Sequence, residues 1–148
     1  MISSSRAHRS REKGQGLTEF ALVVPVLLLV AFGLLDLGRA FFAVITISNA
    51  AREGARYLTQ HPEDNLPDAY GTTFAGTKQV AAAEAQGSFI NLTPSNVTVT
   101  YCLDADEFEG CDSGYPVIVS VNYNFNMVLG WLFSNPIVLT RSTRMMVP

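Results

Sequence analysis

Glu19 is the most unusual ionisable residue of this sequence, because it lies at the start of a long apolar stretch. Residues 13–25, KGQGLTEFALVVP, pass from a charged, glycine-flanked segment directly into that stretch. An unpaired carboxylate in lipid is costly, so an acid inside a membrane helix is a candidate functional residue. The nearest cation, Lys13, precedes the apolar stretch. Two positions remain open for Glu19: the inner headgroup region, where its charge costs little, or the lipid, where it needs a cationic partner.

The other ionisable and nucleophilic residues do not form a recognisable catalytic group. The two histidines, His8 and His61, have no spacing that suits a metal site. No glycine-rich phosphate loop is present, and the serines have no plausible histidine base. Acids gather near residues 104–112, but their spacing does not fit a calcium loop, and we interpret them as a solvated hairpin tip. The sequence therefore predicts no enzyme activity, no metal and no other cofactor.

The two cysteines, Cys102 and Cys111, both lie in the part of the chain that we expect outside the cytoplasm. A disulfide persists in such a compartment. It would close a loop with eight residues between the partners. The alternative is a pair of buried free thiols, and the disulfide is the favoured interpretation.

The apolar stretch is long enough to cross a membrane. Phe20 to Leu35 contains no charged residue, and the run from Leu17 to about Ala40 provides the roughly twenty apolar residues that a bilayer core requires. Residues 1–16 are basic and the chain after Tyr57 is acidic, so the N-terminus is expected in the cytoplasm and the rest outside. Basic residues beside an apolar run serve insertion, so no nucleic-acid partner is expected.

Helical periodicity continues beyond the apolar stretch and predicts one helix over residues 18–58. Pro25 is expected to kink it, and His61-Pro62 to end it. Asp36 and Arg39 are three residues apart and can pair near the outer interface. Either this pair marks the point where lipid ends, or it binds neighbouring subunits. A stripe of small residues allows another backbone to approach closely: Ala50, Ala51, Gly54 and Ala55.

The remainder of the chain predicts a small α+β head. After a loop over 59–76, an alanine-rich helix is expected at Thr77–Gln86. Alternating apolar residues then predict an antiparallel sheet of about three strands, at Asn96–Leu103, Pro116–Asn126 and Ile137–Met145. The predicted organisation is a basic, disordered leader at 1–14, a transmembrane and stalk helix at 15–58, and an extracytoplasmic head at 59–148.

Two stretches resemble the TadE-like family of pilus assembly proteins, found with bacterial tight-adherence (Flp) pili. They are GQGLTEFALVVPVLLLVAFGLLDLGR at 14–39 and NAAREGARYL at 49–58, and the resemblance over residues 14–58 covers about a third of the chain. The first is similar to the family's glycine-to-glutamate start and its helix exit. The second is similar to its A-A-R-E-[GA]-A-R stretch.

The resemblance implies a processing site and an assembly residue. Prepilin-like members lose a short basic leader to a membrane peptidase, the prepilin peptidase, which cuts after a glycine. A cut after Gly14 would make Gln15 the first residue, Glu19 the fifth and Phe20 the sixth. In related pilins the glutamate is thought to meet the free amine of a neighbouring subunit, and two buried charges are tolerable when they pair.

The expected function is that of a minor pilin-like subunit of the cytoplasmic membrane, which supports assembly of a tight-adherence surface pilus. Its expected partners are the membrane, other pilin-like subunits, the assembly machinery and the prepilin peptidase. A single-pass anchor with an extracytoplasmic binding head that never enters a fibre is one alternative. An abundant pilin that forms the fibre is another.

Overall fold

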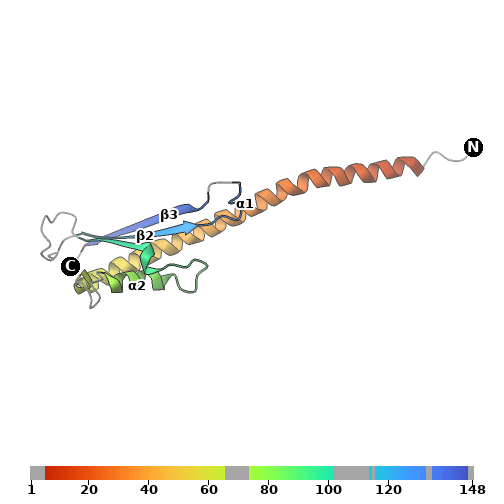
Figure 1. Ribbon diagram of the computed structural model, residues 1–148. Helices are drawn as coiled ribbons and strands as arrows, with labels where there is room; N and C mark the ends of the chain where they lie inside the picture. The colour runs from red at the N-terminus through yellow and green to blue at the C-terminus, as the bar shows by residue number, and fades with distance from the viewer. Residues whose placement is uncertain (1–5, 66–73, 102–113, 115, 133–134, 147–148) are drawn as a thin grey trace, which may run out of the picture. The chain divides into compact units, whose positions relative to one another are not determined.

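The computed structural model describes residues 6–65, 74–101, 114, 116–132 and 135–146. They form two α-helices, two short 3-10 helices and three strands, and the α+β class is confirmed (Figure 1). The chain divides into two compact units, residues 1–38 and 39–148, with the boundary inside the first helix. Cys102 and Cys111 lie outside the described residues, so the disulfide stays a prediction.

The first unit is the N-terminal part of α1, a helix that spans Arg6–Gln60. The helix begins within the segment for which the sequence predicted a disordered leader. Arginine, alanine, glutamate and lysine are good helix formers and no proline intervenes, which explains the earlier start. Pro25 lies inside the helix and removes one backbone hydrogen bond there. The helix ends at Gln60, as predicted from His61-Pro62.

The second unit contains a three-stranded antiparallel sheet in the order β1-β2-β3, with β2 in the centre. The strands are β1 (Val97–Tyr101), β2 (Pro116–Phe125) and β3 (Ile137–Met146). Val119 of β2 pairs with Val99 of β1 and Thr143 of β3, which fixes the register. All three strands lie where the alternation of apolar residues predicted them.

The core of this unit lies between the sheet and the C-terminal part of α1. In β2, alternate side chains are buried, which is the expected pattern for a strand with one covered face. Buried residues of α1 recur with helical spacing and join them in the core: Ala43, Ile47, Ala50, Ala51 and Ala55. Leu58 and Val117 form a second, smaller cluster. The sheet therefore has one face on α1.

The second helix, α2 (Ala75–Glu84), packs against the same part of α1. It begins and ends two residues earlier than predicted. Gly54 of α1 makes this packing possible, because an added Cβ would lie 3.0 Å from the Ala81 Cβ of α2 and 3.3 Å from Val119 Cγ1 of β2. The small-residue stripe of α1 thus packs against α2 and the sheet within the head.

Two short 3-10 helices that the sequence did not predict complete the second unit. They are η1 (Pro62–Asn65), directly after α1, and η2 (Pro94–Asn96), directly before β1. In η2 the Asn96 side chain accepts a hydrogen bond from Thr93 N at 2.9 Å, which orients the chain as it enters β1.

Candidate functional site

The candidate assembly residue Glu19 lies on the exposed surface of α1, one helical turn after Gln15. Gln15 Nε2 donates a hydrogen bond to Glu19 Oε1 at 3.2 Å. Among the side chains that the structure describes, Gln15 is the one hydrogen-bonded to this carboxylate. A neutral amide satisfies part of the acceptor capacity of Glu19 and leaves its negative charge uncompensated.

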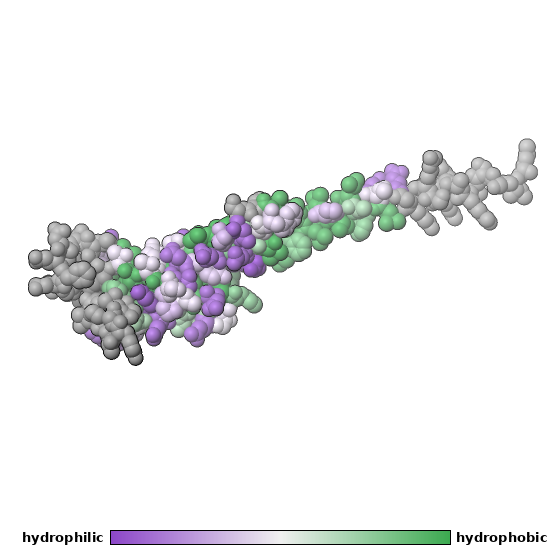
Figure 2. Space-filling model, viewed as in Figure 1, coloured by the Kyte–Doolittle hydropathy of each residue, from purple (hydrophilic) through white to green (hydrophobic). Residues whose placement is uncertain are grey.

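The apolar stretch that contains Glu19 has no basic residue, and the nearest cation in the sequence, Lys13, precedes that stretch. The sequence from Gln15 to Gly38 has no lysine, arginine or histidine. Figure 2 shows this part of α1 as an almost continuous hydrophobic surface, and only 6% of its most apolar stretch is buried. A helix in the core of a soluble fold would be mostly buried. By length and composition this helix can cross a membrane, and a cation for Glu19 must come from outside its apolar segment.

Phe20, the second predicted assembly residue, is 66% exposed beside Glu19. Its aromatic ring adds apolar surface directly next to the carboxylate. Adjacent helix residues point about 100° apart, so Phe20 cannot shield Glu19 on the same face. The two side chains present an acid and a large apolar group to whatever surrounds this end of the helix.

The predicted cleavage bond, between Gly14 and Gln15, lies within α1. Glycines on both sides of Gln15 weaken the helix here, since each costs about 1 kcal/mol relative to alanine. A Cβ on Gly16 would meet no atom within 4 Å, so packing does not require that glycine. Thr18 Oγ1 donates to the Gln15 carbonyl at 2.7 Å. Local unwinding here costs little, which suits access by a peptidase.

Asp36 and Arg39, predicted to pair at the membrane exit, lie on opposite sides of the boundary between the two units. Their pairing stays a prediction. Within the second unit, the Arg39 guanidinium carbon lies 5.3 Å from the centre of the Phe125 ring, a cation–π distance. Arg39 therefore joins the first turn of the head's helix to the end of β2. No sequence pattern predicts this contact.

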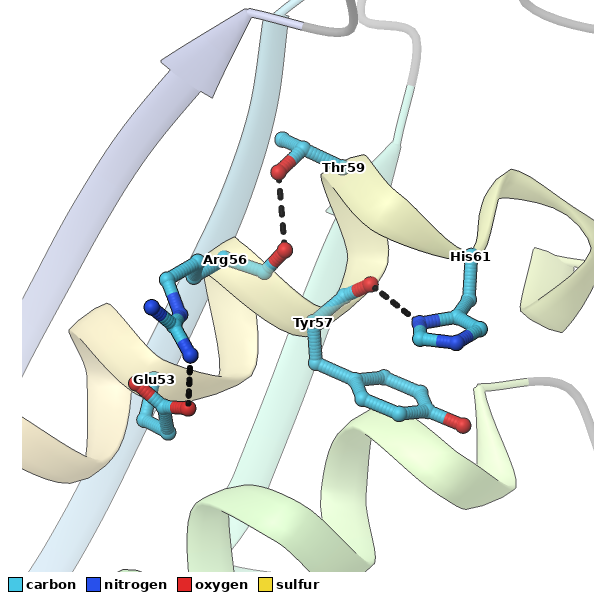
Figure 3. Close-up of polar contacts among 5 residues, drawn as sticks. All are labelled: Glu53, Arg56, Tyr57, Thr59 and His61. Carbon is cyan, nitrogen blue, oxygen red and sulfur yellow. Dashed lines mark hydrogen bonds and ion pairs between the residues drawn. The ribbon is translucent and has the colours of Figure 1, made fainter.

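The second predicted motif, NAAREGARYL, forms the last turns of α1 and serves the fold (Figure 3). Arg56 is exposed and pairs with Glu53 at 3.3 Å. Tyr57 stacks on His61 with ring centres 4.3 Å apart, and His61 Nδ1 donates to the Tyr57 carbonyl at 3.2 Å. Thr59 Oγ1 donates to the Arg56 carbonyl at 2.8 Å. The two hydrogen bonds add to the backbone bonding at the end of α1, where the Tyr57 carbonyl also accepts from His61 N at 2.9 Å.

The first motif and most of the second lie within one match to a known family. Residues 14–56 match the family model of TadE-like proteins. The resemblance that the sequence predicted is thereby confirmed over this range. The TadE-like segment includes Gly14, Gln15, Glu19 and Phe20, together with the part of α1 that supports the sheet. It stops before α2 and the strands. Comparison with curated proteins and with solved structures gave no match.

One structural residue beyond the TadE-like segment was missed from the sequence. Asp64 of η1 accepts hydrogen bonds from Gly76 N at 3.0 Å, Thr77 N at 2.7 Å and Thr77 Oγ1 at 2.5 Å. Its backbone oxygen also accepts from Phe74 N at 2.7 Å. Asp64 thus serves as the acceptor at the start of α2, where free N–H groups favour an acid. An Asp twelve residues before a glycine gives no local signal of this role.

The TadE-like segment supports a general assignment to pilus-associated, pilin-like proteins, a structural rather than an enzymatic class. Its apolar helix is compatible with a single-pass membrane anchor. What this segment offers chemically at its N-terminal end is the carboxylate of Glu19, in a stretch over residues 15–38 that contains no lysine, arginine or histidine.

Proposed function

We propose that this protein is a minor pilin-like subunit of the cytoplasmic membrane that supports assembly of a tight-adherence surface pilus. The observation that carries the proposal is Glu19. It lies in a TadE-like segment, in a stretch over residues 15–38 that contains no lysine, arginine or histidine, and its described partner is the neutral amide of Gln15. A buried carboxylate in that setting is tolerable when a partner molecule supplies the positive charge.

The partner charge in this proposal is the N-terminal amine of a neighbouring, processed subunit. Cleavage after Gly14 by a prepilin peptidase creates such an amine at Gln15. Each processed chain then carries one new cation and one carboxylate four residues apart, and α1 helices of two subunits can exchange them. The basic residues before Gly14 place the uncleaved N-terminus in the cytoplasm and the head outside. The protein acts without a cofactor, catalytic group or nucleic acid.

The experiment that tests the proposal is the mass of the N-terminal peptide of the protein isolated from its own membranes. A peptide that begins at Gln15 is expected. A matched pair of variants sharpens the result: Gly14→Leu should keep the leader, whereas Gly16→Ala, whose new Cβ meets nothing, should still be processed. A wild-type peptide that begins at Met1 would contradict the proposal and favour a permanent anchor with a binding head.

A further inference from the structure

Large apolar side chains remain exposed on the second unit close to its first residue, Arg39. Phe41 is 69% exposed, Phe89 is 97% exposed and Trp131 is 79% exposed. Phe42, Val128 and Leu132 are also exposed, and we call these six residues the aromatic rim. Among the residues that the structure describes, none of these six belongs to the two core clusters of the head. Apolar surface of this kind marks an interaction site.

Three separate segments of the rim are connected to the first turns of α1 in the second unit. Phe41 and Phe42 belong to α1 itself. Phe89 packs edge-on against Phe42, with ring centres 6.1 Å apart. Arg39 covers Phe125, the last residue of β2, and the turn that carries Trp131 follows directly.

The turn that carries Trp131 is compact and holds the indole near that end of β2. Gly130 N donates to the Met127 carbonyl at 3.2 Å and Leu132 N to the Leu129 carbonyl at 2.9 Å. Leu129 is buried, so the turn is fastened to the fold while Trp131 points away from it. The exposure of the indole is therefore a fixed feature of the turn.

The length of the apolar segment places this end of the head at the membrane surface. Leu17 to Gly38 spans about 33 Å as a helix, close to the roughly 30 Å of a hydrocarbon core. The chain therefore leaves the hydrocarbon at about Gly38, and Phe41 and Phe42 follow within one turn. This holds for any orientation of the head, because chain connectivity alone keeps Arg39 and the segments bound to it near the exit point.

We infer that the aromatic rim rests in the headgroup region of the membrane leaflet on the side of the head. Tryptophan and other aromatic side chains favour this region, where an apolar ring body meets lipid and a polar tip meets water. Arg39 lies at the same level, with its aliphatic stem toward lipid and its charge toward the phosphates. The inference rests on the proposed membrane insertion of α1. It adds that the head docks on the lipid surface, and that entry into a fibre must withdraw the rim from lipid.

The single tryptophan of the chain makes the inference directly measurable. The full-length protein is reconstituted into vesicles of phosphatidylcholine and phosphatidylglycerol, and flotation with the vesicles first establishes insertion. Trp131 fluorescence is then compared in lipids brominated near the top of the acyl chains and near their ends. Quenching of at least about twofold by the shallow bromines is expected, with weaker quenching by the deep ones and little by aqueous iodide.

Two variants in a Trp131→Phe background provide matched probes. Phe89→Trp places the indole elsewhere on the rim and should show the same shallow quenching. Gln60→Trp places it at the exposed end of α1, about 31 Å along the helix from Arg39, and should respond to iodide instead.

The outcomes separate this inference from the proposed function. A protein that floats with vesicles while Trp131 is quenched by iodide and not by bromolipids overturns the docked rim and leaves the membrane anchor intact. Protection from both quenchers would show that protein covers the rim, as in a contact between copies, and would also overturn it. Failure to float would instead contradict the membrane anchor itself.

Discussion

Gly54 of α1 lies so close to Ala81 of α2 that a Cβ on Gly54 would stand 3.0 Å from the Ala81 Cβ. Val119 Cγ1 of the sheet would be 3.3 Å from the same position. A single glycine therefore allows α1 to touch a helix and a strand at one level of the head. Since Ala50, Ala51 and Ala55 are also fully buried in this core, the stripe of small residues joins the TadE-like segment to the head.

Substitution of Gly54 should destabilise the head. We expect Gly54→Val to lower the free energy of unfolding by about 1–3 kcal/mol, because the larger side chain must push α2 or β2 away. The measurement is the melting temperature of the detergent-solubilised full chain, which should fall by several degrees. Gly16→Ala is the control, since its Cβ meets nothing within 4 Å and alanine favours helix. An unchanged melting temperature for Gly54→Val would show that α1 and α2 are not in close contact.

Removal of the Asp64 carboxylate should loosen the start of α2. Asp64→Ala takes away the acceptor of three hydrogen bonds from Gly76 and Thr77, so we expect a loss of about 1–2 kcal/mol. Glu63→Ala removes the neighbouring exposed acid and should change stability by less than about 0.5 kcal/mol. Urea unfolding of both variants, followed by circular dichroism, distinguishes them. Equal free energies of unfolding for the two variants would mean that the three hydrogen bonds of Asp64 contribute nothing to stability.

The charge of Glu19, rather than its size, should govern assembly. Glu19→Gln keeps an oxygen that Gln15 can still reach and removes the negative charge. We expect Glu19→Gln and Glu19→Ala to reduce piliation alike, measured as fibres recovered from sheared cells, while alkaline extraction shows both chains still in the membrane. Thr18→Val, one residue away, should assemble normally. Piliation at the wild-type level in Glu19→Gln would show that the carboxylate is not a charge partner.

The predicted disulfide gives a stability test that is independent of assembly. Cys102→Ser and Cys111→Ser should each lower the stability of the oxidised protein by about 2–3 kcal/mol, because a closed loop of this size restricts the unfolded chain. The double variant should be no worse than either single one. Reduction should lower the melting temperature of the wild type to that of the variants. It should leave the melting temperatures of the variants unchanged. Equal melting temperatures of oxidised and reduced wild type would favour two free thiols.

The elements themselves could be predicted from the sequence because their signals are local. The long helix, its end before Pro62, the second helix and the three strands all follow from periodicity and from proline within short windows. The sequence predicted a start of α1 at residue 18, whereas the helix begins at Arg6. The charged segment before residue 15 is expected to be disordered from its polarity, but its residues favour helix. The two 3-10 helices were missed because three or four residues carry little periodic signal.

The candidate assembly residue could also be found from the sequence, because an acid in an apolar run stands out by composition alone. The contact of Asp64 with α2 could not, since it joins residues twelve and thirteen positions apart through a turn whose course is not encoded locally. The exposure of Trp131 could not be predicted either, because an apolar residue type suits a buried position and an exposed one.

The sequence by itself thus determined which segments are helix and strand, that one helix can cross a membrane, and that Glu19 is an unmatched charge at its start. These properties depend on the order and chemistry of neighbouring residues. Only the tertiary structure decided that Ala81 and Val119 pack against the small-residue stripe at Gly54. The same holds for the contact of Arg39 with Phe125 and for the exposure of Trp131. Those outcomes depend on which distant surfaces meet, and the free energy of that packing belongs to no single segment.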